Sequence, residues 1–237
     1  MPTCTFTSQI PVKLVSANAS DEWVVASARV STLGIDSVLP EKAYEHERLI
    51  NFLVKNRHGS PFEHNQFIFV VRAPIFVWRE HMRHRIGFSY NEESGRYKTL
   101  EPVFYIPGEM RKMVQVGKPG AYTFEASSME QHDMVTYIMS QACDEAYQDY
   151  ESLLQKGIAR EVARMVLPVN IFSTAYVTMN ARSLMNFLSL RTHAENSTFP
   201  SFPMAEIEMV AEQYEVEFAR LMPLTHAAFC NNGRVAP

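Results

Sequence analysis

The order in which strand and helix patterns follow one another constrains the fold of this chain more than any other feature. The segment "VNIFSTAYVTM" (169–179) is typical of a buried strand, and the largely apolar helix pattern "NARSLMNFLSLRT" (180–192) follows it directly. Elsewhere, strand and helix patterns intermix without the regular βαβ alternation of a parallel sheet. We therefore predict an α/β fold in a single domain, residues 1–237, with a mixed or antiparallel central sheet flanked by helices.

Capping residues and apolar periodicity predict the remaining elements. One pattern begins at Pro74 and predicts a helix that runs into "RHRIGFSYNEESGRY" (83–97), whose second half we expect to form a loop. A turn is predicted at "KPGAY" (118–122). The other predicted helices cover residues 21–31, 40–57, 128–156, 159–167 and 204–222, and the other predicted strands cover residues 10–17, 65–73 and 101–107.

Charge and cysteine content exclude several classes of protein. The net charge of −4 argues against a nucleic-acid or membrane surface, so any anion site must come from local clusters of arginine. Cys4, Cys143 and Cys230 are far apart and odd in number, which predicts neither a disulfide framework nor a zinc site. No segment has the length and apolarity of a signal peptide or a membrane span. We expect a soluble protein of the cytoplasm with reduced thiols.

The segment "REHMRHR" (79–85) places three arginines beside one glutamate. Arginine binds phosphate through two parallel hydrogen bonds, so the segment is a candidate anion site, although a solvated helix end would have the same composition. His81 and His84 form an HxxH pair, a spacing found in metal sites. The flanking arginines would repel a divalent cation, and we predict no metal there.

Ser94 lies in the same polar stretch but lacks the surroundings of a nucleophile. Glu92 stands where a nucleophile elbow would have its first glycine, and the nearest bases in the sequence are carboxylates. We interpret Ser94 as a hydrogen-bond donor in a loop.

Two further arginine sets lie on predicted helices. Arg160 and Arg164 are four residues apart, and Arg182, Asn186 and Arg191 lie on a helix that is otherwise mostly apolar. Buried arginines need partners, which could be internal salt bridges or a ligand. Arg182 and Asn186 are one turn apart, whereas Arg191 lies about half a revolution away around the helix axis. This arrangement favours a ligand site shared between subunits.

Four blocks of sequence resemble one family. "RHR", followed after eight residues by Ser94, is similar to the signature of the flavin-dependent thymidylate synthases. The blocks "RHGSPFEHNQFIF", "APIFVWREHMRHR", "AREVARMVLPVNIF" and "MNARSLMNFLSLR" follow in the order of that family and cover His58 to Arg191. A single match would be weak, but four ordered matches are specific.

The resemblance implies an enzyme that converts dUMP to dTMP on a thymidylate-synthase-complementing type fold. It implies FAD as cofactor, with methylenetetrahydrofolate and NADPH as co-substrates, in a homotetramer with active sites shared between subunits. By position, Arg191 would be catalytic and would polarise the uracil ring. The residues implied for dUMP are Glu80, Arg83, Glu92, Ser94, Gly95, Arg96 and Arg164. The residues implied for FAD are His58, Ser60, Arg83, His84, Arg85, Glu92, Asn180, Arg182 and Asn186.

The chemistry of the residues agrees with that mechanism. Arginine stays protonated, so Arg191 can stabilise negative charge but cannot act as a general base. Reduced flavin supplies the hydride, so no cysteine is required. Two alternatives stay open at this point. One is a nucleotide- or RNA-binding module, against which the net charge argues. The other is a thymidylate synthase of the cysteine type, although neither Cys143 nor Cys230 has an arginine-flanked sequence context.

Overall fold

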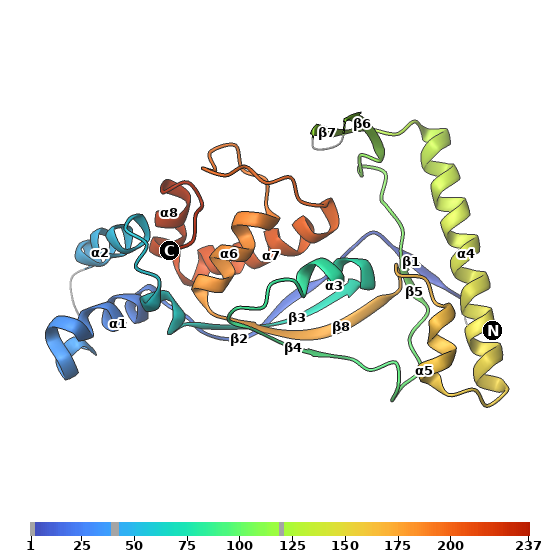
Figure 1. Cartoon of the computed structure of the whole chain (residues 1–237), viewed down its shortest axis with the longest axis horizontal. Helices are drawn as coiled ribbons and strands as arrows, with labels where there is room; N and C mark the ends of the chain where they lie inside the picture. The colour runs from blue at the N-terminus through green and yellow to red at the C-terminus, as the bar shows by residue number, and fades with distance from the viewer. Residues whose placement is uncertain (1–2, 39–42, 119–120) are drawn as a thin grey trace. The chain divides into compact units, whose positions relative to one another are not determined.

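The computed structural model describes residues 3–38, 43–118 and 121–237, and its contacts divide the chain into two compact units (Figure 1). Unit 1 comprises Met1–Gln9, Ala73–Trp78 and Glu93–Ser173, and unit 2 comprises Ile10–Arg72, Arg79–Glu92 and Thr174–Pro237. Each unit thus collects segments that are far apart in the sequence.

A four-stranded sheet with the order β2-β3-β8-β4 is the centre of unit 2. β2 (Val12–Asn18) pairs antiparallel with β3 (Gln66–Pro74), and β4 (Phe88–Glu92) pairs antiparallel with β8 (Phe172–Met179). Together with a parallel pair in unit 1, this confirms the predicted α/β fold with a mixed and antiparallel sheet.

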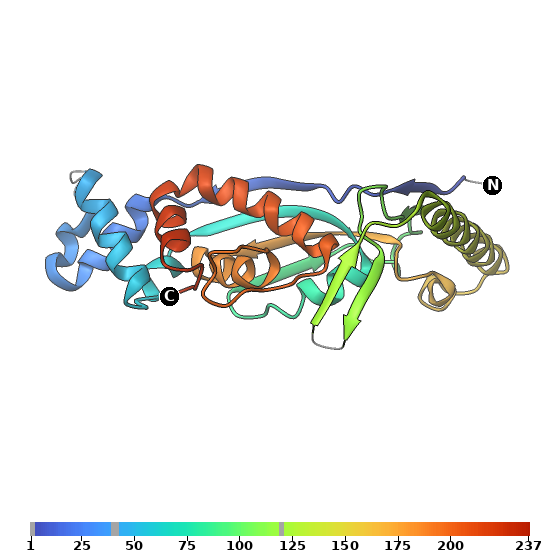
Figure 2. The same ribbon diagram turned by 90° about the horizontal axis from the view of Figure 1, so that it is seen from above.

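Buried and less buried residues alternate along β3, which shows which face of the sheet packs against helices. Phe67, Phe69 and Val71 are fully buried, whereas the residues between them are less so, as expected for a strand with one face against the core. The Phe69 ring lies 4.4 Å from that of Tyr214, and the Phe67 ring 6.2 Å from that of Phe218. Both partners belong to α7, so α7 packs on this face, with α6 beside it (Figures 1 and 2).

Two helices of unit 2 begin with a side-chain cap, one of them at the predicted residue Ser20. Ser20 accepts a hydrogen bond from the Trp23 N–H and caps α1, and Asn180 caps α6 through the Ser183 N–H. The first residues of the predicted helix 40–57 lie outside the described residues, and α8 was not predicted. The helices are α1 (Asp21–Leu33), α2 (Ala43–Lys55), α6 (Ala181–Arg191), α7 (Ala205–Leu221) and α8 (Pro223–Asn231), with 3-10 turns η1 (Gly34–Val38) and η2 (Ser60–Glu63).

The predicted helix from Pro74 into "RHR" is wrong at its end. α3 (Ile75–His81) stops before Arg83, and β4 occupies residues where we expected a loop. The Tyr90 hydroxyl hydrogen-bonds the carbonyl oxygens of His81 and His84, the acceptors that a continuing helix would use. Gly87 then adopts a φ of +70°, which favours glycine, and the chain turns into the sheet.

Unit 1 is built around the long helix α4 (Met129–Gln155), which starts with a capping box at Ser128 and Gln131. Tyr147 and Tyr150 of α4 are buried and hydrogen-bond the main chain of Leu100. Residues 119 and 120, the centre of the predicted turn, lie outside the described residues. The predicted helix 159–167 is shorter than expected and ends as a 3-10 turn. The other elements are β1 (Thr5–Thr7), β5 (Val103–Tyr105), β6 (Val114–Lys118), β7 (Ala121–Glu125), α5 (Arg160–Ala163) and η3 (Arg164–Val166).

None of the described helices is both long enough and apolar enough to cross a membrane.

Candidate functional site

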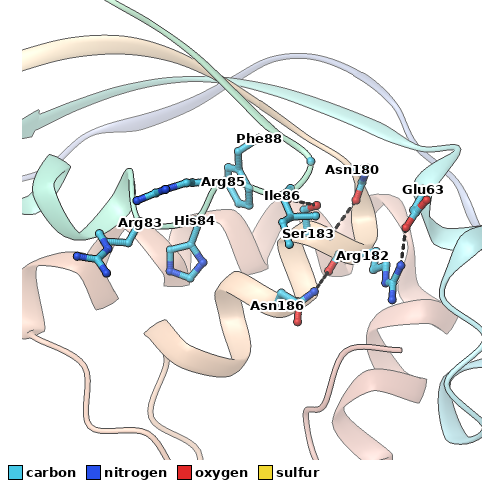
Figure 3. A pocket seen from close by; sticks show the side chains of 11 residues that line it. Glu63, Arg83, His84, Arg85, Ile86, Phe88, Asn180, Arg182, Ser183 and Asn186 are labelled. Atoms are coloured by element: carbon cyan, nitrogen blue, oxygen red, sulfur yellow. Dashed lines mark hydrogen bonds and ion pairs between the residues drawn. The ribbon is translucent and has the colours of Figure 1, made fainter.

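A cavity of about 720 Å³ in unit 2 brings together six of the residues predicted for FAD (Figure 3). It lies between the segment after α3 and the first turns of α6. The predicted residues that line it are Arg83, His84, Arg85, Asn180, Arg182 and Asn186, and the others are Glu63, Ile86, Gly87, Phe88 and Ser183. Its ionised side chains are three arginines and one glutamate, 3 − 1 = +2 with His84 neutral, which suits an anionic ligand.

The segment "RHRIG" is fixed to α6 by a close approach at Gly87. A Cβ on Gly87 would collide with the Ser183 hydroxyl, so only glycine fits at this position. The Ser183 hydroxyl donates to the Ile86 carbonyl oxygen at 2.8 Å. This hydrogen bond joins residues that are 97 positions apart in the sequence. It fixes the segment after α3, which forms one wall of the cavity, to α6, which forms another.

Arg182 is held at the cavity by acceptors that the sequence did not indicate. Its Nε donates to the main-chain oxygen of Pro237 and its Nη1 to Glu63, both at 2.6 Å. A Cβ on Gly59 would lie 2.5 Å from Arg182 Nε, so the absence of a side chain at Gly59 leaves room for the guanidinium. Asn186, one turn along α6, donates to the Arg182 carbonyl oxygen. Both side chains therefore face the cavity, as their spacing predicted.

Arg191, the predicted catalytic residue, is the last residue of α6 and has two acceptors. Its Nε donates to His84 Nε2 at 3.0 Å and its Nη1 to Glu80 at 2.8 Å. Because arginine only donates, His84 Nε2 must accept, and a neutral His84 then carries its proton on Nδ1. Burial and the charge of Arg191 lower the pKa of His84 from 6.5 to about 4. Near neutral pH, His84 is therefore a neutral ring with Nδ1–H left for a ligand.

His81 lies beneath the cavity in a buried hydrogen-bonded chain. The Tyr90 hydroxyl lies 2.9 Å from the His84 carbonyl oxygen and 3.0 Å from the His81 carbonyl oxygen. Since a carbonyl oxygen only accepts, the hydroxyl is the donor in these contacts. The third contact, at 3.1 Å, is then a hydrogen bond from His81 Nδ1–H to the Tyr90 hydroxyl oxygen. His81 Nε2 then accepts from the Tyr214 hydroxyl at 3.0 Å. Burial lowers the pKa of His81 to about 3. Both histidines of the HxxH pair thus have Nε2 occupied by other partners and do not form a metal pair.

A second group of predicted residues lies together in unit 1. The Arg96 N–H donates to the Ser94 hydroxyl oxygen at 3.2 Å, and Gly95 packs closely against the side chain of Arg164. Arg96 also pairs with Glu161 of α5 at 2.8 Å. In the part of the chain that the structure describes, the Ser94 hydroxyl thus meets a main-chain N–H and not a histidine, as expected for a loop residue and not for a nucleophile.

Three of the residues predicted for FAD lie outside the main cavity. His58 is exposed, with its ring 5.6 Å from that of Phe52, and it lines a separate cavity of about 450 Å³ beside α1 and α2. Ser60 is exposed at the start of η2, and Glu92 is exposed at the end of β4. Their assignments stay predictions. Glu63, at the end of the same 3-10 turn as Ser60, is a charged lining residue that was not predicted.

The cysteines differ in their surroundings. Cys4 and Cys143 are buried, which raises the pKa of Cys4 to about 12 and also raises that of Cys143. Cys230 is half-buried, and its sulfur lies 3.5 Å from Nη1 of Arg234. The sequence around Cys230 did not indicate this arginine, which lies four residues later and beyond the end of α8.

The chain is similar to known proteins over nearly its whole length. The family described as "Thymidylate synthase complementing protein" matches residues 13–224. A protein of Streptomyces avermitilis called flavin-dependent thymidylate synthase is 56% identical over 235 residues, 98% of this chain and 95% of that protein. The solved structure of a UMP/dUMP methylase, PolB from Streptomyces cacaoi, bound with 5-Br UMP has a TM-score of 0.93 at 48% identity and covers 100% of both chains. The same methylase bound with 5-Br dUMP has a TM-score of 0.94 at 49% identity, covering 98% of this chain and 100% of that one.

Proposed function

The chain belongs to the family of the flavin-dependent thymidylate synthases, and from that premise we propose that it methylates dUMP to dTMP with FAD as cofactor. Methylenetetrahydrofolate would supply the carbon and NADPH the reducing equivalents. The observation that carries the proposal is the cavity at the start of α6, where six residues predicted for FAD meet next to the Arg191–His84 contact.

The residues of the cavity fit a flavin dinucleotide. Arg83, Arg85 and Arg182 offer planar, charged donors of the kind that bind a diphosphate. Asn180 and Asn186 add amide groups, and Ile86 and Phe88 add apolar surface, as a ring system requires. When bound, FAD supplies hydride-transfer chemistry that no side chain of the protein can provide.

Arg191 would act on the nucleotide as a fixed donor. Its contacts with Glu80 and His84 orient the guanidinium and leave its remaining N–H groups for a ligand. Such a preorganised donor stabilises negative charge that develops on a uracil ring. Neither Arg191 nor His84 can serve as a base near neutral pH, since arginine stays protonated and the His84 Nε2 lone pair is already occupied.

The unit 1 group would bind the nucleotide through hydrogen bonds and charge. Arg96 and Arg164 are cations, and Ser94 and the main chain at Gly95 can donate. The ion pair of Arg96 with Glu161 is more than half exposed, so an incoming anion could displace Glu161 at little cost. Glu80, Arg83 and Glu92 complete the set proposed for dUMP, and His58, Ser60 and Glu92 complete the set proposed for FAD.

No thiol takes part in the proposed reaction. A nucleophilic cysteine must reach its substrate as a thiolate, whereas Cys4 and Cys143 are buried thiols with raised pKa values. Cys230 lies among Glu215, His226 and Arg234, none of which lines the cavity.

The assembly and location belong to the same proposal. We propose a single domain, because the family match spans segments of both units, and a homotetramer with active sites shared between subunits. Exposed apolar residues on one face of α4, namely Met134, Tyr137 and Ile138, support self-association. We place the enzyme in the cytoplasm.

The test uses purified protein reconstituted with FAD. We expect flavin absorption in the visible range and tritium release from C5-labelled dUMP that depends on methylenetetrahydrofolate and NADPH. UMP is assayed in parallel, because the methylase at 48% identity is described as acting on UMP and dUMP. A protein that binds no flavin, or that releases tritium from neither nucleotide, would overturn the proposal.

Arg182→Ala tests the assignment of the cavity to FAD. We expect FAD affinity to fall by about 1.5–3 kcal/mol, the usual loss for a hydrogen bond to a charged group. Arg220→Ala is the matched control, because Arg220 pairs on the surface with Glu217 of its own helix and does not line the cavity. Flavin titration monitored by fluorescence measures both variants. Equal affinities in the two would contradict the assignment.

A further inference from the structure

A cluster of four polar side chains lies in unit 2, apart from the residues that line the cavity. Glu215 comes from α7, His226 and Cys230 are one turn apart on α8, and Arg234 follows α8. The sulfur of Cys230 lies 3.5 Å from Arg234 Nη1 and 3.6 Å from His226 Nε2. Arg234 donates to both carboxylate oxygens of Glu215 at 2.7 Å, and His226 Nε2 lies 2.8 Å from one of them.

The cluster has the residue types of a metal site, but a cation already occupies it. Glu215, His226 and Cys230 could each offer a ligand atom, and these atoms lie within 4.8 Å of one another. The guanidinium of Arg234 engages both oxygens of Glu215 and the sulfur. Arg234 is only 7% exposed and stacks on Phe229 at 5.0 Å, so it cannot leave easily. A divalent ion would meet this fixed positive charge.

The surroundings of Cys230 are those of a reactive thiol. Reactive cysteines lie in partly exposed, electropositive places, where cationic N–H groups hydrogen-bond the sulfur. Cys230 is half-buried and has two such donors, because hydrogen bonds with Cys230 and Glu215 raise the pKa of His226 to about 9 and keep it protonated. Cys4 and Cys143 are buried, and their hydrogen-bond partners among the described residues are Asp144 and Asn170 respectively, neither of which is a cation.

We propose that Cys230 is a modification site for hydroperoxides and other small electrophiles. With hydrogen peroxide, the thiolate sulfur attacks one oxygen, the O–O bond breaks, and the departing hydroxide takes a proton from His226 and leaves as water; an organic hydroperoxide would lose an alkoxide, which leaves as the alcohol. The sulfur loses two electrons and becomes sulfenic acid, while the peroxide gains them. Arg234 and His226 hold the sulfur in place for this attack.

Modification of Cys230 would affect Arg191 through Arg234. The second guanidinium nitrogen of Arg234 donates to the Thr192 hydroxyl at 2.8 Å, and Thr192, the residue that ends α6, is bonded directly to Arg191. Added atoms on Cys230 would compete for the same guanidinium and weaken its hold on Thr192. This coupling rests on the proposed function, whereas the reactivity of the thiol does not.

Alkylation of the folded holoenzyme with iodoacetamide at pH 8, followed by peptide mass mapping, tests the reactivity. Burial raises the pKa of Cys4 to about 12 and also raises that of Cys143, so these two residues are almost entirely in the unreactive thiol form at pH 8. We expect the Cys230 peptide to be alkylated first. His226→Gln, which keeps a hydrogen-bond donor but removes the charge, should slow the reaction at Cys230. Labelling of Cys4 or Cys143 at the same rate as Cys230 would overturn the proposal, as would an unchanged rate in His226→Gln.

Turnover of the modified enzyme tests the coupling. After stoichiometric alkylation of Cys230, or its oxidation by hydrogen peroxide, we expect turnover to fall by about ten-fold, the effect of one or two lost hydrogen bonds. The FAD content should not change, because the cluster does not line the cavity. Cys230→Ser should keep its turnover after the same treatment. Full turnover in the alkylated native enzyme would refute the coupling between Cys230 and Arg191. An enzyme with no turnover before treatment would refute the proposed function, and the result of the alkylation experiment would still hold.

Discussion

The proposed mechanism depends most on Arg191 and Ser94, and the structure gives these two residues different partners. Arg191 is oriented by a carboxylate and a neutral imidazole, which fixes its donors before a ligand arrives. Ser94 accepts a hydrogen bond from the main chain of its own loop. The first arrangement suits the electrostatic role proposed for Arg191, and the second suits the positioning role proposed for Ser94.

Arg191→Ala should separate catalysis from cofactor binding. We expect tritium release from C5-labelled dUMP to fall by about 10²–10³, the range for removing one preorganised electrostatic contact. Flavin should stay bound, because Arg191 does not line the cavity. Tritium release and flavin absorbance are measured on the same preparation. Loss of flavin together with activity would show that Arg191 supports the fold of the cavity instead.

Ser94→Ala should have a smaller effect of another kind. If Ser94 only orients the nucleotide, the loss is one hydrogen bond, roughly ten-fold, and it appears in the apparent affinity for dUMP. A covalent nucleophile would instead cost several orders of magnitude in turnover at saturating dUMP. Steady-state kinetics over a range of dUMP concentrations distinguish the two. An inactive variant with normal nucleotide binding would refute the positioning role.

At the scale of single elements, α6 could be predicted well and the segment before β4 could not. The apolar pattern of α6 and its capping residue Asn180 are local features, so its bounds and the shared face of Arg182 and Asn186 followed from the sequence. α3 ends at His81 because of hydrogen bonds from Tyr90, and Glu63 reaches Arg182 across 119 residues. Neither contact produces a periodic pattern of apolar residues, so neither could be predicted from the sequence.

The chain of hydrogen bonds from Tyr214 through His81 to Tyr90 gives a prediction for the segment after α3. Tyr90→Phe removes the donor that holds the His84 carbonyl oxygen, whereas Tyr214→Phe leaves that bond in place. Each variant leaves a buried polar group unpaired and should lower the free energy of unfolding by about 1–3 kcal/mol. Only Tyr90→Phe should also weaken FAD binding, because it frees one wall of the cavity.

Urea denaturation gives the stability of these two variants, and flavin titration gives their affinity for FAD. The two variants serve as controls for each other, since similar losses of stability are expected from both. Equal losses of FAD affinity would mean that the chain of hydrogen bonds stabilises the fold without positioning the segment.

At the scale of the whole molecule, the residues predicted from four sequence blocks fall into two groups, one in each unit. The group in unit 2 has the cavity and Arg191, and the group in unit 1 has Ser94, Gly95, Arg96 and Arg164. Motif order along the chain predicted the members of both groups. Their division over two compact units could not be read from the sequence, because each unit gathers three separate segments.

Stability should depend on pH in a way that two sets of histidines control. Burial, with a contribution from the neighbouring His84, lowers the pKa of His81 to about 3. Burial and the charge of Arg191 lower the pKa of His84 to about 4. Both groups have a pKa of about 6.5 in the unfolded chain. As the pH falls below about 6.5, the unfolded chain binds protons that the folded chain does not, so the free energy of unfolding decreases. His226 behaves in the opposite way. Its pKa is raised to about 9, so its contribution is complete below pH 6.5 and is lost as the pH rises through 9.

We therefore expect the free energy of unfolding to be greatest near pH 6.5 and to fall on both sides. Urea denaturation between pH 4 and pH 9.5 measures this dependence. Two variants show which histidine causes the decrease on the acidic side (the acidic arm) and which causes the decrease on the alkaline side (the alkaline arm). His84→Gln keeps a side chain that can accept from Arg191 but does not titrate, so it should flatten the acidic arm alone. His226→Gln should flatten the alkaline arm, because it removes the paired imidazolium that contributes to stability there. If His84→Gln left the acidic arm unchanged, or His226→Gln left the alkaline arm unchanged, the charge states assigned to these histidines would be wrong, and with them the neutral His84 on which the proposed role of Arg191 depends.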